Sequence, residues 1–466
     1  MAKRRKRETS LQNLVTNFEM MKTNGTVTFN EERSYHDLIE FFQTETQYQK
    51  AIEVVDYALT QFQFRSDFYF IKSKILFEQR SYQESLDFIE MAENISPYEV
   101  DIQLFKSKVL TIIGMSDQAL QIITSLEKTA SQQDLAEVYI SESYIHESSH
   151  DFDQMFQSLK RSLLIDASNS VALERIWQSV ELSKNFEECI FLHKLIIDEF
   201  PYNSPAWFNL GHAYSSVGEY QFAIDALEYS FIINPEFEDG YLDCADLCFQ
   251  LKKYEQAKSI YGEAVEKFGK DPDTLLNLAQ CQFKLNDING AKSSLIHALS
   301  LDPYYDEAQY LIANCYLIEE NITPAIKALK KAIYLDDSRE EYYHSLARCY
   351  VHLADFDKAK RNYFKAAVRG TEQSLYWEEY IAFLIKLQEY NPAMKVVDEA
   401  EKFTYSDKLM YCKSAISFKL MDYTSGLEQL EEAITENADN LKFFYDLVPE
   451  LRENEDIQAA IRYFLG

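Results

Sequence analysis

The sequence predicts an all-α chain built from stacked helix hairpins, and three observations lead to that prediction. Small residues recur at an interval of about 34 residues along almost the whole chain. The apolar residues around them follow the i, i+3, i+4 and i+7 spacing of helices with one buried stripe. Only 11 Gly and 9 Pro in 466 residues leave little material for β-turns, and no Gly-, Pro- or Ser-rich stretch separates domains. One continuous helical array therefore fits better than several globular domains.

The recurrence is clearest in two columns of small residues. In the first column, successive members are separated by the same repeat interval, with two exceptions. The separation is two residues longer after residue 119 and one residue shorter after residue 393. Its members are Ala51, Ser85, Ala119, Met155, Cys189, Ala223, Ala257, Ala291, Ala325, Ala359, Ala393, Gly426 and Ala460. The second column lies twelve residues before the first, at Ser73, Ser107, Ser143, Gly211, Ala245, Ala279, Ala313, Ala347 and Ser414. Because antiparallel helices cross closely only where neither carries a bulky side chain, the columns predict the crossing point of each hairpin.

The stretch that begins at Ser204 carries the most specific pattern. It contains a Trp, a Leu-Gly pair, a Tyr, an Ala and a closing Pro at fixed spacing, namely Trp207, Leu210, Gly211, Tyr214, Ala223 and Pro235. This pattern resembles the tetratricopeptide-repeat signature in residue type and in spacing. The resemblance covers about residues 32 to 466, as twelve full units and a last hairpin. It implies a right-handed α-solenoid superhelix of antiparallel helix pairs, which binds other proteins.

The first 31 residues are expected to form a basic tail and an N-terminal capping helix. Lys3 to Arg7 are all basic, and we interpret them as a solvated disordered end, with a nuclear address or an anionic-surface contact as alternatives. An amphipathic stripe follows, formed by Leu11, Leu14, Val15 and Phe18, and it is expected to stop near Asn24-Gly25. Such a helix would cover the first hairpin, although it could instead bind a partner.

The remaining chain divides into four segments by regularity. Residues 32–135 predict three units, residues 204–440 predict regular units, and residues 441–466 predict a C-terminal capping hairpin. Residues 136–203 are irregular, because they follow a two-residue insertion and place Met155 and Trp177 where other units have small residues. We therefore expect looser hairpins, with a bend or hinge around residues 130 to 200.

The irregular segment contains the zinc-hydrolase pattern His146-Glu147-Ser148-Ser149-His150. Two His at i and i+4 on one helix could hold zinc, and the Glu could act as a general base. The repeat phase, however, places His150 in the turn after the first helix of its unit. Asp151 supplies a charge where such helices are usually uncharged, and no sheet-bearing catalytic domain is predicted. We therefore reject a metal site at His146 and His150 and predict no catalytic residues.

The seven cysteines also have a structural interpretation. Cys281, Cys315 and Cys349 follow one another at the repeat interval, which predicts one equivalent buried position in successive units. Cys244 and Cys248 could share a metal, but no further ligand lies at a suitable spacing. With no CxxC pair and no export-signal pattern, the cysteines indicate reduced thiols in a cytoplasmic protein. No cofactor motif is present, and no apolar run reaches membrane-spanning length.

The resemblance also implies where partners bind, because in the family the first helices line a concave groove. Carried onto this sequence, the groove residues are Phe208, His212, Asp239, Asp243, Asp246, Phe249, Asp273, Asn277, Gln280, Phe283, Glu307, Tyr310, Asn314, Leu317, His344, Arg348 and His352. Family members that bind acidic chaperone tails use a clamp of Lys, Asn and Arg, and this stretch has Asp where that clamp needs cations. Carboxylates and aromatics predict basic or mixed extended segments with apolar anchors. These charges could instead serve only to solubilise an exposed helix face.

Three functions remain after these arguments. The first is a non-catalytic scaffold or adaptor that binds extended or helical segments of other proteins. The second is a regulatory or assembly subunit of an enzyme complex, which would expose a large apolar patch. The third and most remote is a zinc hydrolase that uses His146 and His150. Nucleic acid is a poor partner for the body of the chain, because the formal charge is −30. The oligomeric state is left open.

Overall fold

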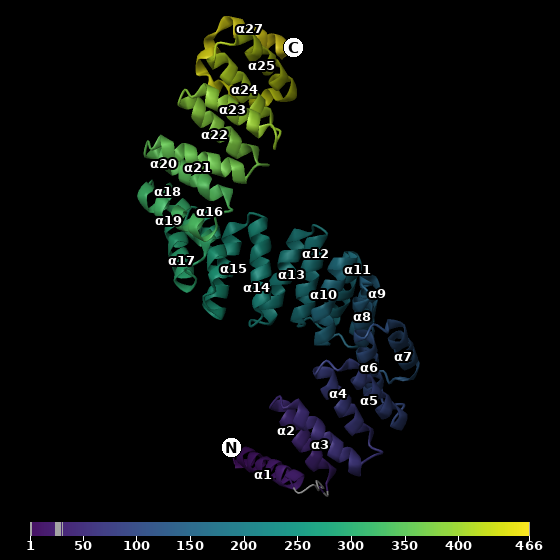
Figure 1. Ribbon diagram of the computed structural model, residues 1–466. Coiled ribbons are helices and arrows are strands. Elements are labelled where there is room, and N and C mark those ends of the chain that lie inside the picture. Colours follow the sequence, from purple (N-terminus) through teal and green to yellow (C-terminus); the bar gives the residue numbers. More distant parts are fainter. Residues whose placement is uncertain (1, 24–28, 30, 466) are drawn as a thin grey trace. The chain divides into compact units, whose positions relative to one another are not determined.

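The computed structural model describes residues 2–23, 29 and 31–465, and every regular element among these residues is a helix (Figure 1). The chain divides into two units, residues 1–240 and residues 241–466. In each unit the helices follow one another as consecutive hairpins, which confirms the predicted all-α solenoid. The predicted helix stop at Asn24-Gly25 lies outside the described residues.

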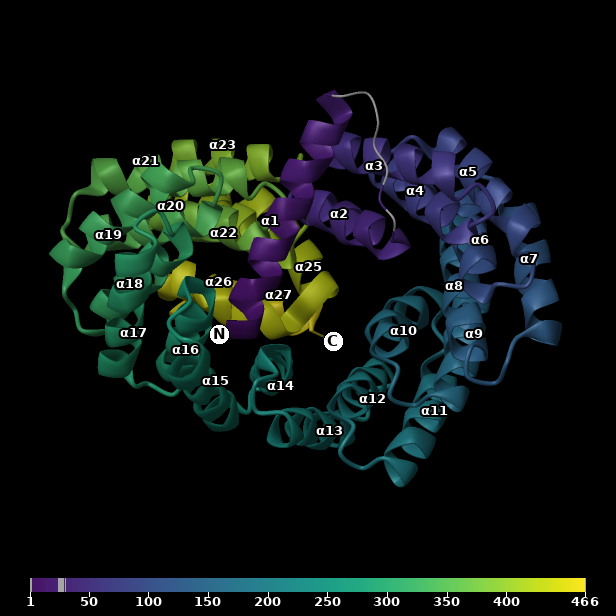
Figure 2. The ribbon, with the colours of Figure 1, turned by 90° about the horizontal axis from the view of Figure 1, so that it is seen from below.

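The helices of the first unit have similar lengths after the first of them. They are α1 (Ala2–Thr23), α2 (Glu32–Thr44), α3 (Tyr48–Gln61), α4 (Ser66–Glu78), α5 (Tyr82–Ile95), α6 (Val100–Ile112), α7 (Ser116–Thr129), α8 (Leu135–Ser148), α9 (Phe152–Ile165), α10 (Ser170–Ser183), α11 (Phe186–Glu199), α12 (Ser204–Ser216) and α13 (Tyr220–Ile233). Even-numbered helices are the first helices of their hairpins. Figure 2 shows α10 and α12 on the inner side of the curve, with α11 and α13 on its outer side.

The division between the units falls within α14 (Glu238–Gln250), and the same alternation continues in the second unit. Its helices are α15 (Tyr254–Phe268), α16 (Pro272–Lys284), α17 (Ile288–Leu301), α18 (Asp306–Ile318), α19 (Ile322–Leu335), α20 (Glu340–His352), α21 (Phe356–Arg369), α22 (Ser374–Lys386), α23 (Tyr390–Ala400), α24 (Asp407–Lys419), α25 (Tyr423–Asn437), η1 (Ala438–Asn440), α26 (Leu441–Leu447), η2 (Pro449–Glu453) and α27 (Glu455–Phe464). Within this unit α18 and α20 lie on the inner side of the curve, while α19 and α21 lie outside (Figure 2).

The two columns of small residues meet where the helices of a hairpin cross. Ser73 and Ser85 are fully buried, and each hydroxyl donates to the backbone carbonyl of the other residue, at 2.7 and 2.8 Å. Ser414 makes the same bond to the carbonyl of Gly426 at 2.8 Å. A small side chain therefore permits the close approach, and a serine there also satisfies its own buried hydroxyl.

A left-handed residue ends the first helix of each hairpin. The residues with positive φ in these turns are Thr46, Arg80, Gly114, His150, Lys184, Gly218, Lys252, Asn286, Glu320, Ala354, Gln388 and Met421. They recur at nearly the same interval as the small residues. Since a left-handed conformation is costly for L-residues and not for glycine, most of these turns carry local strain.

We therefore expect Ala354→Gly to stabilise its hairpin by about 1 kcal/mol, because it removes the left-handed penalty from an exposed position. Ala347→Gly is the matched control, since Ala347 lies fully buried within α20. That change should destabilise the protein through helix propensity and lost packing. Urea unfolding of the two variants measures both effects, and a destabilising Ala354→Gly change contradicts the expectation.

The irregular segment contains one loose hairpin and not the two predicted from Met155 and Trp177, because α8 and α9 approach each other as closely as the helices of the regular hairpins. The two helices of the α10–α11 hairpin approach one another much less closely than those of the other hairpins described from α2 to α13. Trp177 occupies the crossing position, and its ring stacks on His212 of α12 with the centroids 4.9 Å apart. This hairpin is therefore open, and the bulk of Trp177 accounts for the separation of its helices. The bend or hinge stays a prediction.

The N-terminal helix packs on the first hairpin through its C-terminal half. Phe18 is fully buried, and its ring lies 6.1 Å from that of Phe42 and 6.0 Å from that of Tyr57. Leu14 and Val15 pack partly buried beside it. Because α1 begins at Ala2, the basic run of residues 3–7 is helical, whereas the sequence suggested an end without regular structure.

The C-terminal segment covers the last full hairpin. Phe444 of α26 is fully buried against Tyr411 and Phe418, with ring centroids 6.2 and 6.0 Å away. In α27, Ile457 and Ile461 are buried in the same apolar cluster. A short 3-10 helix, η2, separates α26 from α27. A role for this segment as the cap of the solenoid stays a prediction.

Candidate functional site

The zinc-hydrolase pattern does not form a continuous helical motif. Helix α8 ends at Ser148, and His150 lies in the following turn with φ of 58°. Glu147, which would be the general base, is paired with the Arg175 guanidinium at 2.7 Å. Asp151 caps α9 by accepting a hydrogen bond from the Gln154 backbone N–H at 3.1 Å. The structure therefore confirms the prediction that His150 lies in the turn after the first helix of its unit.

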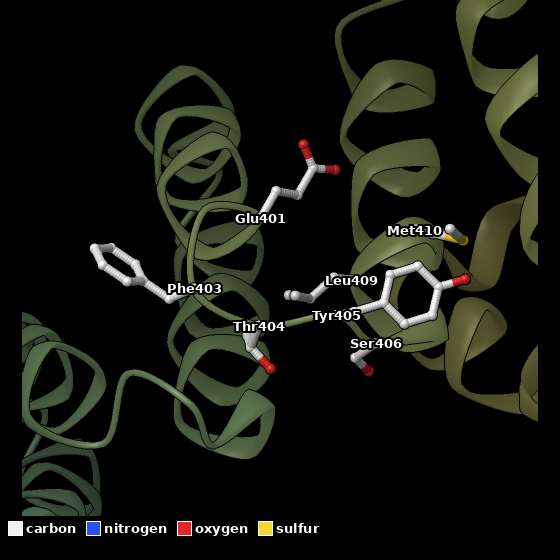
Figure 3. A pocket seen from close by; sticks show the side chains of 7 residues that line it. All are labelled: Glu401, Phe403, Thr404, Tyr405, Ser406, Leu409 and Met410. Carbon is white, nitrogen blue, oxygen red and sulfur yellow. The ribbon is translucent and has the colours of Figure 1, made fainter.

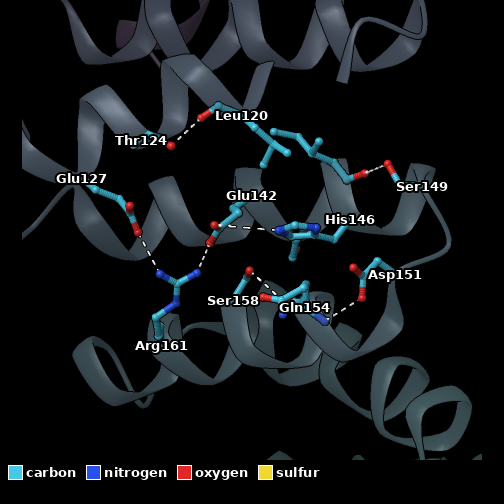
Figure 4. Close-up of polar contacts among 12 residues, drawn as sticks. Leu120, Thr124, Glu127, Glu142, His146, Ser149, Asp151, Gln154, Ser158 and Arg161 are labelled. Carbon is cyan, nitrogen blue, oxygen red and sulfur yellow. Dashed lines mark hydrogen bonds and ion pairs between the residues drawn. The ribbon is translucent and has the colours of Figure 1, made fainter. Parts of the chain in front are cut away.

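His146 instead belongs to a polar network between α8 and α9 (Figure 4). Its Nε2 lies 3.9 Å from a Glu142 carboxylate oxygen, and the other Glu142 oxygen is paired with Arg161. Arg161 also reaches Glu127 of α7 at 2.8 Å. Burial alone would raise the pKa of Glu142, but the polar groups of His146 and Ser158 nearby and the charge of Arg161 hold that pKa below its usual value. This network ties three helices together and explains the polar residues without catalysis.

The cysteines predicted to pack in the core do so. Cys281, Cys315 and Cys349 are each fully buried, and burial raises their thiol pKa values to about 12, 11 and 11. Neutral thiols of this kind are poor nucleophiles and poor metal ligands. The column therefore has a packing role.

Three polar side chains form a row on the first helices of the second unit. Gln280 of α16, Asn314 of α18 and Arg348 of α20 follow one another at the repeat interval. Gln280 and Asn314 are partly exposed and Arg348 is exposed. Within the described residues, none of these three side chains donates or accepts a hydrogen bond, and the same holds for Asn277 of α16. We call these four residues the amide row.

Aromatic rings lie beside the amide row. The ring of Tyr310 packs against that of Tyr342 at 4.8 Å, and Phe283 packs partly buried on the core of the same helices. Phe249 of α14 lies 5.3 Å from Tyr254. Phe249, Phe283 and Tyr310 each pack against another ring or the apolar core on one side, and each keeps part of its surface in solvent. The face therefore combines unsatisfied amides with rigid apolar surface.

Several carboxylates predicted for the groove are already bonded within the chain. Asp273 accepts a hydrogen bond from the Tyr305 hydroxyl at 2.6 Å, and Glu307 is paired with Arg339 at 2.7 Å. Asp246 accepts a hydrogen bond from the buried Tyr261 hydroxyl. Desolvation raises the pKa of Asp246, and this hydrogen bond opposes the rise. The acidic character of this face is thus weaker than the sequence suggests.

His344 also serves the packing between repeats. Its Nε2 lies 2.7 Å from a Glu379 carboxylate oxygen of α22, and only 12% of its side chain is exposed. The bond to His344 is the largest cause that lowers the pKa of Glu379. Rings of Tyr363 and Tyr376 enclose His344 at 5.9 and 5.2 Å. This residue is therefore poorly placed to contact a partner.

In the first unit, the predicted groove residues form an aromatic cluster. The ring of Phe208 lies 4.5 Å from that of His212 and 4.8 Å from that of Phe237. His212 also stacks on Trp177. Asp239 is exposed nearby on α14. The cluster links α10, α12 and the start of the next hairpin, and sequence reasoning did not foresee the part played by Trp177 and Phe237.

Two further features are weaker candidates. A pocket of 410 Å³ lies where α23 gives way to α24, lined by Glu401, Phe403, Thr404, Tyr405, Ser406, Leu409 and Met410 (Figure 3). Among the residues that line it, only Glu401 is charged. Elsewhere, Glu32, His36 and Asp67 bring three possible metal ligands within 4.8 Å of one another. Arg65 already pairs with both carboxylates of that group.

Across the described residues, none of the helices combines the length and the apolarity that a membrane crossing requires.

Comparisons with known proteins bear on the repeats. Two tetratricopeptide-repeat family models match, one at residues 249–297 and the other at residues 204–235 and 306–339. No curated protein matches the sequence. Among solved structures, YrrB, described as a TPR protein with an unusual peptide-binding site, is 18% identical, with a TM-score of 0.34 over 40% of this chain and 95% of that chain. Yeast Tom70 is 14% identical, with a TM-score of 0.40 over 92% of this chain and 98% of that chain. MamA is 19% identical, with a TM-score of 0.33 over 34% of this chain and 94% of that chain.

The family matches fall on the units that carry the signature residues and on the hairpins α12–α13, α14 to α17 and α18–α19. Together with the regular succession of hairpins, they show that the chain contains tetratricopeptide repeats at these residues.

Proposed function

We propose that the protein is a non-catalytic scaffold or adaptor, which binds extended or helical segments of other proteins on the inner faces of its first helices. The observation that carries this proposal is the amide row, Asn277, Gln280, Asn314 and Arg348. The Asn and Gln amides each offer donors and an acceptor, and the Arg348 guanidinium offers donors only, so together they can bind the main chain of an extended segment. No hydrogen bond within the described part of the chain engages these side chains, so their donors and acceptors are available to a ligand.

The chemistry of the partner follows from the groups around the amide row. Phe283 and Tyr310 offer apolar surface to an anchoring side chain. Asp239, Asp243 and Asp246 add negative charge on α14, and Arg348 adds positive charge on α20. We infer basic or mixed segments with apolar anchors, which do not require a cofactor. The high negative charge of the chain disfavours nucleic acid as a partner.

The proposed location is the cytoplasm. All seven cysteines are buried, and Cys281, Cys315 and Cys349 recur at the repeat interval, which is not the spacing of a disulfide framework. A regulatory or assembly subunit of an enzyme complex is the second candidate function. Exposed apolar residues on α11 and α13 favour it, because stable subunits bury such surface against a partner.

The test compares partner recovery by two matched triple variants in native lysate. Gln280→Ala/Asn314→Ala/Arg348→Ala removes three side chains of the amide row. The control, His297→Ala/Lys330→Ala/Arg361→Ala, removes exposed side chains from the second helices of the same hairpins. We expect a specific set of proteins to be lost from the first variant only, identified by mass spectrometry. Equal losses from both variants, or none from either, contradict the proposal.

A charge variant tests the class of partner separately. Asp239→Asn/Asp243→Asn/Asp246→Asn removes three charges, and an asparagine can still accept the Tyr261 hydrogen bond. Partners with basic segments should be recovered about tenfold less well at moderate salt, and the difference should shrink at high salt. Unchanged recovery at low salt means that these carboxylates only solubilise the helix face.

A further inference from the structure

The outer face of α11 and α13 exposes more apolar side chain than a free helix surface needs. Six residues on these two helices are large, apolar and well exposed: Phe191 61%, Leu195 44%, Tyr220 46%, Phe222 57%, Tyr229 50% and Ile232 63%. On α11, Phe191 and Leu195 are four residues apart, so they share one side of the helix. On α13, Phe222, Tyr229 and Ile232 lie seven and three residues apart and also share a side.

Contacts through α12 connect these two stripes. The ring of Tyr214 packs 5.5 Å from that of Phe222, and the Lys194 ammonium of α11 lies 5.5 Å from the Tyr214 ring. Further along, the Trp207 ring lies 4.8 Å from that of Tyr229, and its indole N–H donates to the Pro201 carbonyl at 2.8 Å. Tyr214 of α12 therefore bridges the two outer helices, and Trp207 joins α13 to the loop that follows α11.

The apolar stripes also have a defined charge around them. Asp198 follows Leu195 by three residues, and Asp225 lies between Phe222 and Tyr229 on the same side of α13. Both carboxylates are exposed, as are Glu187 and Glu199. Lys194 is the one Lys or Arg among the residues of α11 and α13, and it is engaged with Tyr214. The surface is thus apolar with an acidic margin.

The charge decides what kind of molecule can cover this surface. A second copy of this chain would bring the same carboxylates opposite their equivalents, in a protein with a formal charge of −30. A segment with apolar residues on one side and Lys or Arg on its flanks meets both features. Each outer helix has 14 residues, a length that suits a helical partner of about four turns.

We propose that the outer face of α11 and α13 binds an amphipathic helix of a partner protein, whose apolar side covers Phe191, Leu195, Phe222, Tyr229 and Ile232 and whose flanks are basic. This binding surface differs from the amide row, because it lies on second helices and in the first unit. One chain can then hold two partners at once.

The test uses a synthetic 18-residue helix with leucine on one side and lysine on the other, labelled with a fluorophore. Its binding to the full chain is followed by fluorescence anisotropy. The outer-face variant Phe191→Ser/Phe222→Ser/Ile232→Ser should bind the peptide about tenfold more weakly or worse. The control variant Tyr98→Ser/Tyr304→Ser/Tyr334→Ser removes even more exposed rings elsewhere and should bind like wild type. Circular dichroism confirms that each variant is folded.

Charge is tested with two further changes. A peptide with glutamate in place of lysine should bind wild type about tenfold more weakly. The variant Asp198→Lys/Asp225→Lys should reverse that preference. The variant Gln280→Ala/Asn314→Ala/Arg348→Ala should keep the component of binding that the outer-face variant loses, so a failure of the amide row as a site leaves this result intact.

Three results overturn the proposal. The first is no saturable binding of the lysine peptide to wild type, or equal binding to the outer-face variant. The second is loss of lysine-peptide binding in the amide-row variant instead. The third is a wild-type dimer in sedimentation velocity that the outer-face variant abolishes, since that assigns the surface to a second copy of the chain.

Discussion

Replacing Gly211 with valine is expected to destabilise the α12–α13 hairpin by about 3 kcal/mol, the upper end of the usual cost of overpacking. A Cβ atom at Gly211 would lie 2.6 Å from Cγ of Leu227 and 3.2 Å from the backbone oxygen of Ala223. Leu227 is itself buried, so it has little room to move aside. The helices must therefore separate at their crossing, as α10 and α11 do around Trp177.

Gly262 provides the matched control for this prediction. It also lies within a helix, α15, but apart from its chain neighbours and the backbone of its own helix, no atom of the described residues approaches within 4 Å of the position of its Cβ. Gly262→Val should leave stability within about 0.5 kcal/mol of wild type, because only helix propensity changes. Repeat arrays unfold in parts, so hydrogen exchange of peptides from each hairpin is the suitable measurement. Equal exchange in α12 and α13 of wild type and Gly211→Val contradicts the crossing argument.

Stability of the α10–α11 hairpin is expected to fall as the pH drops below 6.5, because of His193. This histidine is fully buried, and burial lowers its pKa from 6.5 to about 4. Its Nδ1 donates to the Cys189 backbone carbonyl at 2.9 Å, while its Nε2 has no hydrogen-bond partner among the described residues. Protonation in the folded state would thus place an unpaired charge in the core.

The sign follows from the two pKa values. Between pH 6.5 and 4 the unfolded segment binds a proton that the folded one does not, so acid favours unfolding. Each pH unit below 6.5 lowers the free energy of unfolding by about 1.4 kcal/mol, so the loss reaches about 2 kcal/mol at pH 5. Above pH 6.5, His193 makes no pH-dependent contribution. His193→Leu should abolish this component and should also remove the cost of the unpaired Nε2.

Hydrogen exchange of peptides from α10 and α11, corrected for the intrinsic rate at each pH, measures this effect. In wild type, the free energy of opening measured by exchange should fall between pH 7.5 and 5. In His193→Leu, that fall should be smaller than in wild type by about 2 kcal/mol. Peptides from α18 and α19 serve as the internal control, since these two helices contain no histidine. Parallel pH profiles for wild type and His193→Leu in α10 and α11 would falsify the assignment to His193.

The fold followed from the sequence because each repeat uses the same small residues at the same places. The crossing of Ser73 and Ser85, the turn at His150 and the buried Cys281 column could all be located from spacing alone. The open hairpin likewise lies where Trp177 interrupts a column of small residues. The helical form of residues 3–7 could not be predicted, because a run of like charges repels itself and favours an extended end.

The candidate site was predicted less completely. The family resemblance placed Gln280, Asn314 and Arg348 in the predicted groove, but it could not reveal that Tyr305 engages Asp273 or that Glu379 engages His344. Those contacts join adjacent repeats, so they depend on how one hairpin stacks on the next. The outer face of α11 did carry a signal, since the helix is apolar on more than one side. The repeat pattern assigns only one buried apolar stripe to each helix, so the second, exposed stripe of α11 was not recognised from the sequence.

The most direct measurement of the central claim is photo-crosslinking from within the amide row. Asn314 is replaced by benzoyl-phenylalanine, the protein is irradiated in native lysate, and the linked peptides are identified by mass spectrometry. Lys330, exposed on the second helix of the same hairpin, carries the same probe as the control. We predict that the probe at position 314 captures defined segments of a few proteins with basic and apolar residues, and that the probe at 330 does not. Capture of the same segments from position 330, and none from position 314, would contradict the proposal that the first helices bind partner proteins.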